Sequence, residues 1–353
     1  KKSKIKKILV NLTIFILLII LTFSLVLKDQ DVSQIFSVAA KVKKQYILFA
    51  VLAMSIYILG EAVNITRILK ELGEKSKLIS NIRYTLIGFF FSAITPAASG
   101  GQPMEIYYMH KDDISVANST LALLMQLCSL QIVTITVGTI SAVIHFEVLK
   151  SGLIYLLILG IILNSSALML LIIAIFSKKL SEGLIKIVVK LLKFFRIPNV
   201  EKKQEKLEKE LESYQTSARY IKEHKILMLK TVITTVVQMI AYYSVPYWIY
   251  LAFGLTEYNI FEILTLQAVL YATVSGIPSP GAVGVSEGGF LGIFKNVFPE
   301  TIISSAMLLT RGANFYLFII ISAIIVMIST FREKRIEKKQ MQETEVLTEK
   351  SEK

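Results

Sequence analysis

The most regular feature of the chain is a series of long hydrophobic runs separated by short charged segments. The first run, Ile8 to Leu27, holds twenty residues without a charge, and a helix needs about 20 apolar residues to cross the hydrocarbon core of a bilayer. Continuous rather than alternating hydrophobicity predicts helices, because lipid offers backbone amides no other partner. Six runs predict full membrane crossings, at about 8–27, 46–66, 116–146, 153–176, 226–253 and 302–330.

The first run follows five lysines within residues 1–7, as the core of a secretory signal would. It is too long for such a core, and no small-residue cleavage site follows Leu27. We therefore expect a retained first membrane helix.

Two further apolar stretches, 84–109 and 260–298, are interrupted by glycine and proline. We expect each to be re-entrant, returning to the side from which it starts. The inside segments then hold 31 Lys and Arg residues and the outside segments 5, in agreement with the positive-inside rule and with cytoplasmic chain ends. Eight full crossings remain the alternative. The inside segments are 1–7, 67–83, 110–115, 177–225 and 331–353, and the outside segments are 28–45, 147–152 and 254–259.

The two broken stretches form part of a weak internal repeat with an offset of 182 residues. Glu105 lies nine residues after Pro96, and Glu287 lies nine residues after Pro278. Each repeat unit, about 46–146 and 226–330, reads helix, broken segment, helix, and the two units run in opposite directions. Inverted repeats with interrupted helices at matching positions are typical of transporters and point to the binding site. A chance match of one spacing remains the alternative.

The predicted membrane domain spans 1–330, with a basic stretch between its halves. Residues 178–196 place apolar side chains on one face and lysines on the others, as in a helix in the headgroup plane. Residues 201–225 form a charged helical pattern that we expect to be solvated, and 331–353 form a charged cytoplasmic tail.

Composition supports an all-α polytopic membrane protein, since 54% of the residues are hydrophobic and mean hydropathy is +0.61. The net charge of +13 fits an anionic membrane surface as partner rather than nucleic acid. The single Cys128 excludes a disulfide framework. The three histidines are scattered, so we expect neither a metal site nor a cofactor.

The first broken stretch contains Thr95-Pro-Ala-Ala-Ser-Gly-Gly-Gln-Pro-Met-Glu105. Its small residues permit a sharp turn and a close approach by another group. A helix beginning near Pro103 would aim free N–H groups at the turn, where they attract anions such as phosphate. Glu105 would then lie in the first turn. A plain turn with Glu105 as a capping carboxylate is the alternative.

The second broken stretch, from Gly276 to Gly289, also combines a broken helix, a flexible turn and a carboxylate, with Glu287 beside two glycines. Irregular backbone at membrane depth must line a cavity or be buried in protein. Arg311 and Glu61 add charges inside apolar runs, where an unpaired charge costs several kcal/mol. A structural ion pair between Glu287 and Arg311 is the alternative to a functional role.

Three other polar groups have simpler interpretations. Arg67 can reach the interface with its long side chain, and the glutamines at 126, 131 and 238 are typical of interhelical hydrogen bonds. The expected substrate-binding and translocation residues are Ser99, Gly100, Gly101, Gln102, Glu105, Pro278, Pro280, Gly281, Gly284, Glu287, Arg311, Asn314, Glu61 and Asn64.

Both motifs, 95–105 and Pro278-Ser-Pro-Gly-Ala-Val-Gly-Val-Ser-Glu-Gly288, resemble the lysylphosphatidylglycerol synthase transmembrane family, the flippase-like part of MprF-type proteins. The resemblance covers about 1–330. Where many relatives have an arginine soon after the Gly-Gly turn, this chain has Gln102 and then Glu105.

The resemblance implies movement of phospholipids, including aminoacylated phosphatidylglycerol, between leaflets of the cell membrane, and a link to resistance against cationic peptides. It implies phospholipid as substrate. If the two motifs form a polar path for the headgroup, Glu287→Ala is expected to abolish transport without loss of folding. Full-length members also carry a soluble domain that transfers lysine from lysyl-tRNA. Only about 23 residues follow the last predicted helix, so we do not expect that activity here. Lysyl transfer and a membrane scaffold for a separately encoded synthase, docked through 178–225, remain the alternatives.

Overall fold

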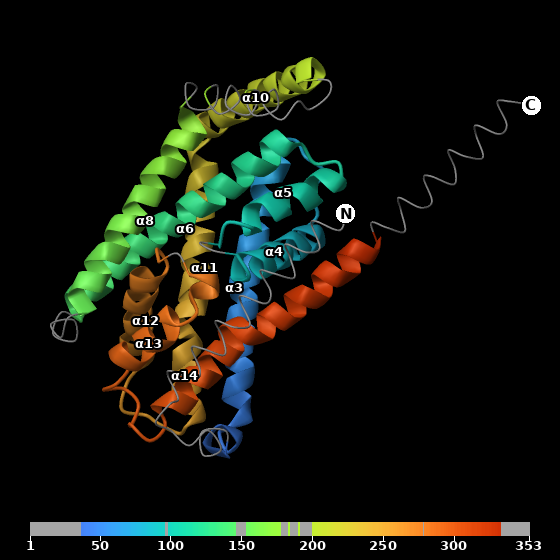
Figure 1. Ribbon diagram of the computed structural model, residues 1–353. Helices are drawn as coiled ribbons and strands as arrows, with labels where there is room; N and C mark the ends of the chain where they lie inside the picture. Colours follow the sequence, from blue (N-terminus) through green and yellow to red (C-terminus); the bar gives the residue numbers. More distant parts are fainter. Residues whose placement is uncertain are drawn as a thin grey trace, which may run out of the picture.

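The computed structural model describes residues 37–95, 98–145, 153–177, 183, 190, 200–277 and 279–332 (Figure 1). All regular elements in this part of the chain are helices. The predicted helix 8–27, most of the amphipathic stretch 178–196 and nearly all of the charged tail lie outside the described residues.

Five helices in the described part are long and apolar enough to cross a membrane, with lengths of 23 to 30 residues. They confirm five of the six predicted crossings, and many of their large apolar side chains face outward, as lipid contact requires. The chain is therefore an all-α, multi-pass membrane protein. The five are α3 (Lys44–Glu71), α6 (Val116–Ile144), α8 (Leu153–Phe176), α11 (Lys225–Ala252) and a last helix over 303–332 that begins as α14 (Ile303–Arg311).

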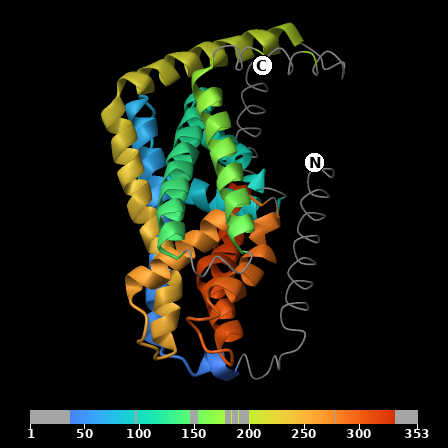
Figure 2. The same cartoon turned by 90° about the vertical axis from the view of Figure 1, so that its left-hand side faces the viewer.

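Helices α3 and α11 lie side by side and antiparallel (Figures 1 and 2). At one end the Lys43 N–H donates to the Ala252 carbonyl (3.0 Å), and at the other Arg67 donates to the Lys230 carbonyl (3.0 Å). Gly60 lets the helices approach closely, because a Cβ there would overlap the side chain of Gln238. This pair forms the axis from which the two broken segments depart.

The first broken segment is a hairpin of α4 (Leu78–Ala93) and α5 (Gly101–Lys111). Its start and its end lie together: Glu74 Oε1 accepts hydrogen bonds from the Ser115 N–H (3.2 Å) and from Asn118 Nδ2 (2.8 Å). An ion pair between Arg83 and Asp112 joins the two arms nearby. The hairpin therefore begins and ends at the same end of the bundle.

The second broken segment is a hairpin at the opposite end of α11, made of α12 (Ile260–Val274), the short turn η2 (Pro280–Ala282) and α13 (Val285–Ile293). The Tyr258 N–H donates to the Tyr250 hydroxyl (3.0 Å), and the Tyr258 hydroxyl donates to the Asn296 carbonyl (2.9 Å). Tyr258 thus ties the start of this hairpin to its end.

The hairpins approach from opposite ends and meet in the middle, where Phe89 and Ser92 of α4 and Gly281 and Ala282 of the second hairpin line one cavity. These contacts favour the re-entrant arrangement over eight crossings. The antiparallel course of α3 and α11 has the sense that the inverted repeat predicts. The 182-residue repeat itself stays a prediction.

Helix α10 (Val200–Glu223) lies across the end of the bundle (Figure 2). The expectation that this charged helix is solvated is wrong for one of its faces, because Ala218 and Ile221 are buried. Ser217 Oγ donates to Asn118 Oδ1 of α6 (2.7 Å), and the Tyr214 hydroxyl donates to the Ala174 carbonyl of α8 (3.0 Å). The charge density of the sequence hid this narrow apolar face.

The hairpin arrangement predicts the labelling of single cysteines introduced at exposed positions in a Cys128→Ala background. Cysteines replacing Lys75 and Lys111 should react with a membrane-impermeant maleimide from one side of the membrane. Cysteines replacing Glu257 and Lys295 should react from the other side. Eight full crossings would instead place the members of each pair on opposite sides.

Candidate functional site

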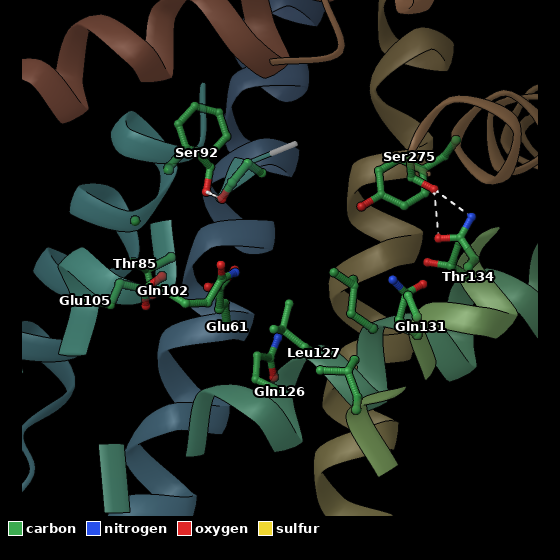
Figure 3. A pocket seen from close by; sticks show the side chains of 18 of the residues that line it. Glu61, Thr85, Ser92, Gln102, Glu105, Gln126, Leu127, Gln131, Thr134 and Ser275 are labelled. Carbon is green, nitrogen blue, oxygen red and sulfur yellow. Dashed lines mark hydrogen bonds between the residues drawn. The ribbon is translucent and has the colours of Figure 1, made fainter. Parts of the chain in front are cut away.

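A cavity of about 670 Å³ opens between α3, α4, α5, α6, α8 and α12 (Figure 3). Its volume falls within the usual range for a small-ligand site, about 300–1,000 Å³. Only two charged side chains, Glu61 of α3 and Glu105 of α5, are among the described residues that line it. Its uncharged polar lining includes Tyr57, Thr85, Ser92, Gln102, Gln126, Gln131, Thr134, Asn164, Tyr271 and Ser275.

Glu105 reaches this cavity because Gly88 of α4 leaves room for it. A Cβ on Gly88 would overlap Oε1 of Glu105. The side chain is buried, with 3% exposed, and its Oε2 has no hydrogen-bond partner among the described residues. A buried carboxylate oxygen without a partner is costly, and the described residues leave this cost uncompensated.

The predicted position of Glu105 in its helix is wrong. Helix α5 begins at Gly101 rather than near Pro103, and its first turn contains no acidic residue. Glu105 therefore belongs to the second turn, beyond the terminal N–H groups that a capping carboxylate would reach. Packing over Gly88, and not the helix dipole, explains its place.

Figure 3 shows Glu61 on the same side of the cavity as Glu105, with Gln131 and Thr134 across from them. Glu61 is partly exposed to the cavity. Two carboxylates from different helices therefore share one polar space.

The predicted functional role of Asn64 is not supported, because its side chain forms an interhelical joint. Its Nδ2 donates to Gln126 Oε1 (2.8 Å), to Thr235 Oγ1 (3.0 Å) and to the Thr231 carbonyl. Asn64 lines neither of the two cavities.

Two other polar groups belong to this joint, Gln126 as expected and Arg67 in place of the expected reach to the interface. Arg67 donates to Asn64 Oδ1 (2.9 Å) and to Thr234, and Gln126 donates to Gln238 (3.3 Å). Gln126 also lines the large cavity, so the joint fixes one wall of the site.

A second cavity of about 300 Å³ lies between the two hairpins. It is lined by the break 275–282, by Arg311 and by Asn314, whose Oδ1 is buried and without a hydrogen-bond partner in the described structure. The two cavities share six lining residues and therefore adjoin one another. The shared residues are Tyr57, Phe89, Ser92, Ala98, Tyr271 and Ser275.

Glu287 and Arg311 form the buried ion pair that the structural alternative predicts, and a functional role for these two charges stays a prediction. Arg311 Nε lies 2.7 Å from Glu287 Oε1, and the side chains are 8% and 0% exposed. The Tyr316 hydroxyl donates to the same oxygen (3.1 Å), and the Gly284 N–H donates to Oε2 (2.7 Å). Both oxygens of the Glu287 carboxylate therefore have hydrogen-bond donors from the protein.

Tyr316 is a partner that the sequence did not indicate. Residues five apart on an ideal α-helix point about 140° away from each other. A π-turn over Gly312–Tyr316 lets Arg311 and Tyr316 reach one carboxylate oxygen. Such turns often occur at functional sites, but a local π-turn leaves no signal in hydrophobic periodicity.

The small residues of the second break position this ion pair. Gly281 (φ 60°) lies against the ring of Phe315, and its carbonyl accepts a hydrogen bond from Arg311 (3.1 Å). Gly284 (φ 86°) begins α13 and Pro280 begins η2. Pro278 lies outside the described residues. At the N-terminus of α13, the Gly284 N–H is engaged by Glu287 of the same helix.

The first break contributes unevenly to the site. Gln102 lines the large cavity, and the Gly100 N–H donates to Thr95 Oγ1 (2.9 Å), which closes the turn. Gly101 is buried at the start of α5. Ser99 is exposed and lines neither cavity, so its predicted role in binding is not supported.

Several lining residues were missed because they are single polar groups within apolar runs. Asn164 of α8 donates to the Ala272 carbonyl (3.2 Å) and to Ser275 Oγ (3.1 Å), and so connects α8 to the second break. In the sequence, Tyr57 and Tyr271 cannot be distinguished from other aromatic residues of membrane helices. The one available signal was Asn164, an amide in a strongly hydrophobic run.

A family model described as lysylphosphatidylglycerol synthase TM region matches residues 8–322 of the chain. No curated protein matches it. The family match includes both breaks and every charged residue of the two cavities.

Glu287→Gln should destabilise the protein by about 3–5 kcal/mol, because it leaves the buried Arg311 without its counter-charge. Thermal unfolding in detergent would measure the loss. Glu287→Gln combined with Arg311→Gln should recover part of it. Glu205→Gln, in the exposed pair with Lys209, serves as control and should cost about 0.3–0.5 kcal/mol. Equal melting of Glu287→Gln and the parent protein would contradict a structural ion pair.

Gly88→Ala should destabilise the protein by about 1–3 kcal/mol, because the added methyl group overlaps the Glu105 carboxylate. Shortening its neighbour, in Gly88→Ala with Glu105→Ala, should relieve the overlap. Gly288→Ala is the matched control, since its Cβ would meet open space and alanine favours a helix by about 0.5–1 kcal/mol. The same unfolding assay decides the comparison, and an unaffected Gly88→Ala would refute the packing.

Proposed function

Since the chain belongs to the lysylphosphatidylglycerol synthase transmembrane-region family, we propose that it moves phospholipid headgroups between the leaflets of the bacterial cell membrane. Phosphatidylglycerol and its lysyl ester are the proposed substrates. The proposal places both chain ends in the cytoplasm. Resistance to cationic peptides would follow because the transported lipid changes the surface charge of the outer leaflet.

The observation that carries the proposal is the meeting of two hairpins from opposite ends of the bundle at adjoining polar cavities. A headgroup is polar and cannot cross hydrocarbon unaided, whereas irregular backbone and polar side chains within a bundle offer it partners. The breaks at 94–100 and 275–284 supply these groups midway along the long helices. Discontinuous helices that meet near the bilayer midplane are a general design of transporters.

The charges divide between the two cavities in a way that suits a headgroup with both signs. The large cavity carries Glu61 and Glu105, and the small one carries Arg311. Arg311 is held by Glu287 and by the Gly281 carbonyl. Its charge is therefore largely balanced, and it would attract a phosphate more weakly than a free guanidinium would. An ammonium group would find the unpaired carboxylates.

Two other functions receive less support. For lysyl transfer the described cavities offer carboxylates, tyrosines and amides but no arrangement for binding tRNA. For a docking scaffold, the apolar face of α10 is already packed on α6 and α8, which leaves only charged and polar faces of this helix for a partner. Neither has a specific observation in its favour.

Glu105→Gln should slow translocation about tenfold or more, since a tenfold change corresponds to about 1.4 kcal/mol of interaction. The measurement is the flipping of fluorescent phosphatidylglycerol, lysyl-phosphatidylglycerol and a neutral lipid in liposomes containing the purified full chain. Glutamine preserves the shape and, because Glu105 has no ion pair in the described structure, folding should survive. This variant therefore separates function from stability better than Glu287→Ala.

The matched control is Glu71→Gln, at an exposed position on the same helix as Glu61, where glutamine can still accept the Tyr220 hydrogen bond (3.1 Å). It should translocate like the parent protein. Absence of movement of any lipid by folded parent protein would remove the proposal.

A further inference from the structure

The large cavity carries negative charge without a positive counterpart. No lysine, arginine or histidine is among the described residues that line it, although two carboxylates do. Glu105 is 3% exposed and its Oε2 has no hydrogen-bond partner in this part of the chain. The nearest guanidinium in the adjoining cavity, Arg311, is already paired with Glu287.

The other groups around the two carboxylates cannot neutralise them. The titratable neighbours in the cavity are Tyr57 of α3 and Tyr271 of α12, which are neutral in their ordinary state. The small cavity adds Tyr242 and Arg311, and Arg311 is paired with Glu287 behind it. The lining from α4, α6 and α8 consists of amides, hydroxyls and apolar groups.

Two ionised carboxylates in such surroundings are unfavourable, because each loses hydration and repels the other. The missing positive charge must come from outside the protein. A proton can supply it by converting one carboxylate into a carboxylic acid, and coupled carboxylates commonly hold one proton between them. The ammonium group of a ligand can supply it instead, and an ammonium ion that pairs with both carboxylates takes the place of the shared proton.

We propose that Glu61 and Glu105 form a cation-exchange site, which holds a proton when empty and releases it when the ammonium group of a headgroup binds. In this exchange the carboxylic O–H bond breaks, the proton passes to cavity water, and the carboxylate pairs with the incoming ammonium ion. The charge of the site is unchanged and no oxidation or reduction occurs. The inference rests on the proposed function and assigns it a coupling mechanism.

A consequence is that a cationic headgroup moves against a proton. Mutually exclusive binding at one site couples two fluxes without a separate energy domain, since each return of the site to the other face carries one ion or the other. A proton gradient would then drive ammonium-bearing lipid in the opposite direction. A headgroup without an ammonium group would gain nothing from the gradient.

The experiment measures proton release from the purified full chain in weakly buffered detergent with a pH-sensitive dye. Lysyl-phosphatidylglycerol should release about one proton per bound lipid, as expected for a shared proton, and phosphatidylglycerol should release none. Potassium chloride is the third arm. Release by potassium equal to that by the lysyl lipid would overturn an ammonium site in favour of an inorganic cation site.

Glu61→Gln and Glu105→Gln should each remove the proton release, and Glu71→Gln should keep it. Thermal unfolding of every variant identifies a folded protein, and release that persists in folded Gln variants would overturn the assignment. A second measurement uses liposomes with an imposed pH gradient, which should speed flipping of the lysyl lipid but not of phosphatidylglycerol. Gradient-independent flipping that still requires Glu105 would overturn the exchange and leave the proposed translocation intact.

Discussion

The need to satisfy backbone polar groups away from water controls this structure. Five described helices satisfy this need with their own backbone hydrogen bonds, but the breaks at 94–100 and 275–284 cannot. They must be enclosed by other helices, and the antiparallel pair α3 and α11 provides the frame that encloses them. The cavities are a direct result, because the space around irregular backbone is lined by the polar groups that such backbone needs.

Much of this arrangement was predictable from the sequence, since it depends on hydrophobic run length and on glycine and proline. The spans and both breaks emerged from these signals, and the charge bias favoured the hairpin arrangement that Glu74 and Tyr258 now support. The side-chain partners were less accessible. Asn64 looked like a binding group but is a joint between helices, since apolar periodicity does not say which neighbour a polar side chain meets.

The cavity lining illustrates the same limit. Tyr57, Asn164 and Tyr271 come from three helices far apart in the chain and meet only through tertiary packing. The π-turn after Arg311 depends on one local backbone choice that composition does not specify. Charged residues in apolar runs could be found from the sequence, because the free-energy cost of placing a charge in the membrane is a property of the residue itself. Their roles could not, because these depend on which groups of other helices surround each charge.

The two motif glutamates show how that difference determines function. Glu105 and Glu287 have the same spacing from a proline, and the sequence treats them alike. Glu287 is surrounded by Arg311, Tyr316 and the Gly284 amide, and a carboxylate with these partners stabilises the fold. Glu105 faces a cavity with one oxygen unpartnered. A protein that fixed both carboxylates would leave neither for a ligand to bind, so the asymmetry between the halves supports the proposed site beside Glu105.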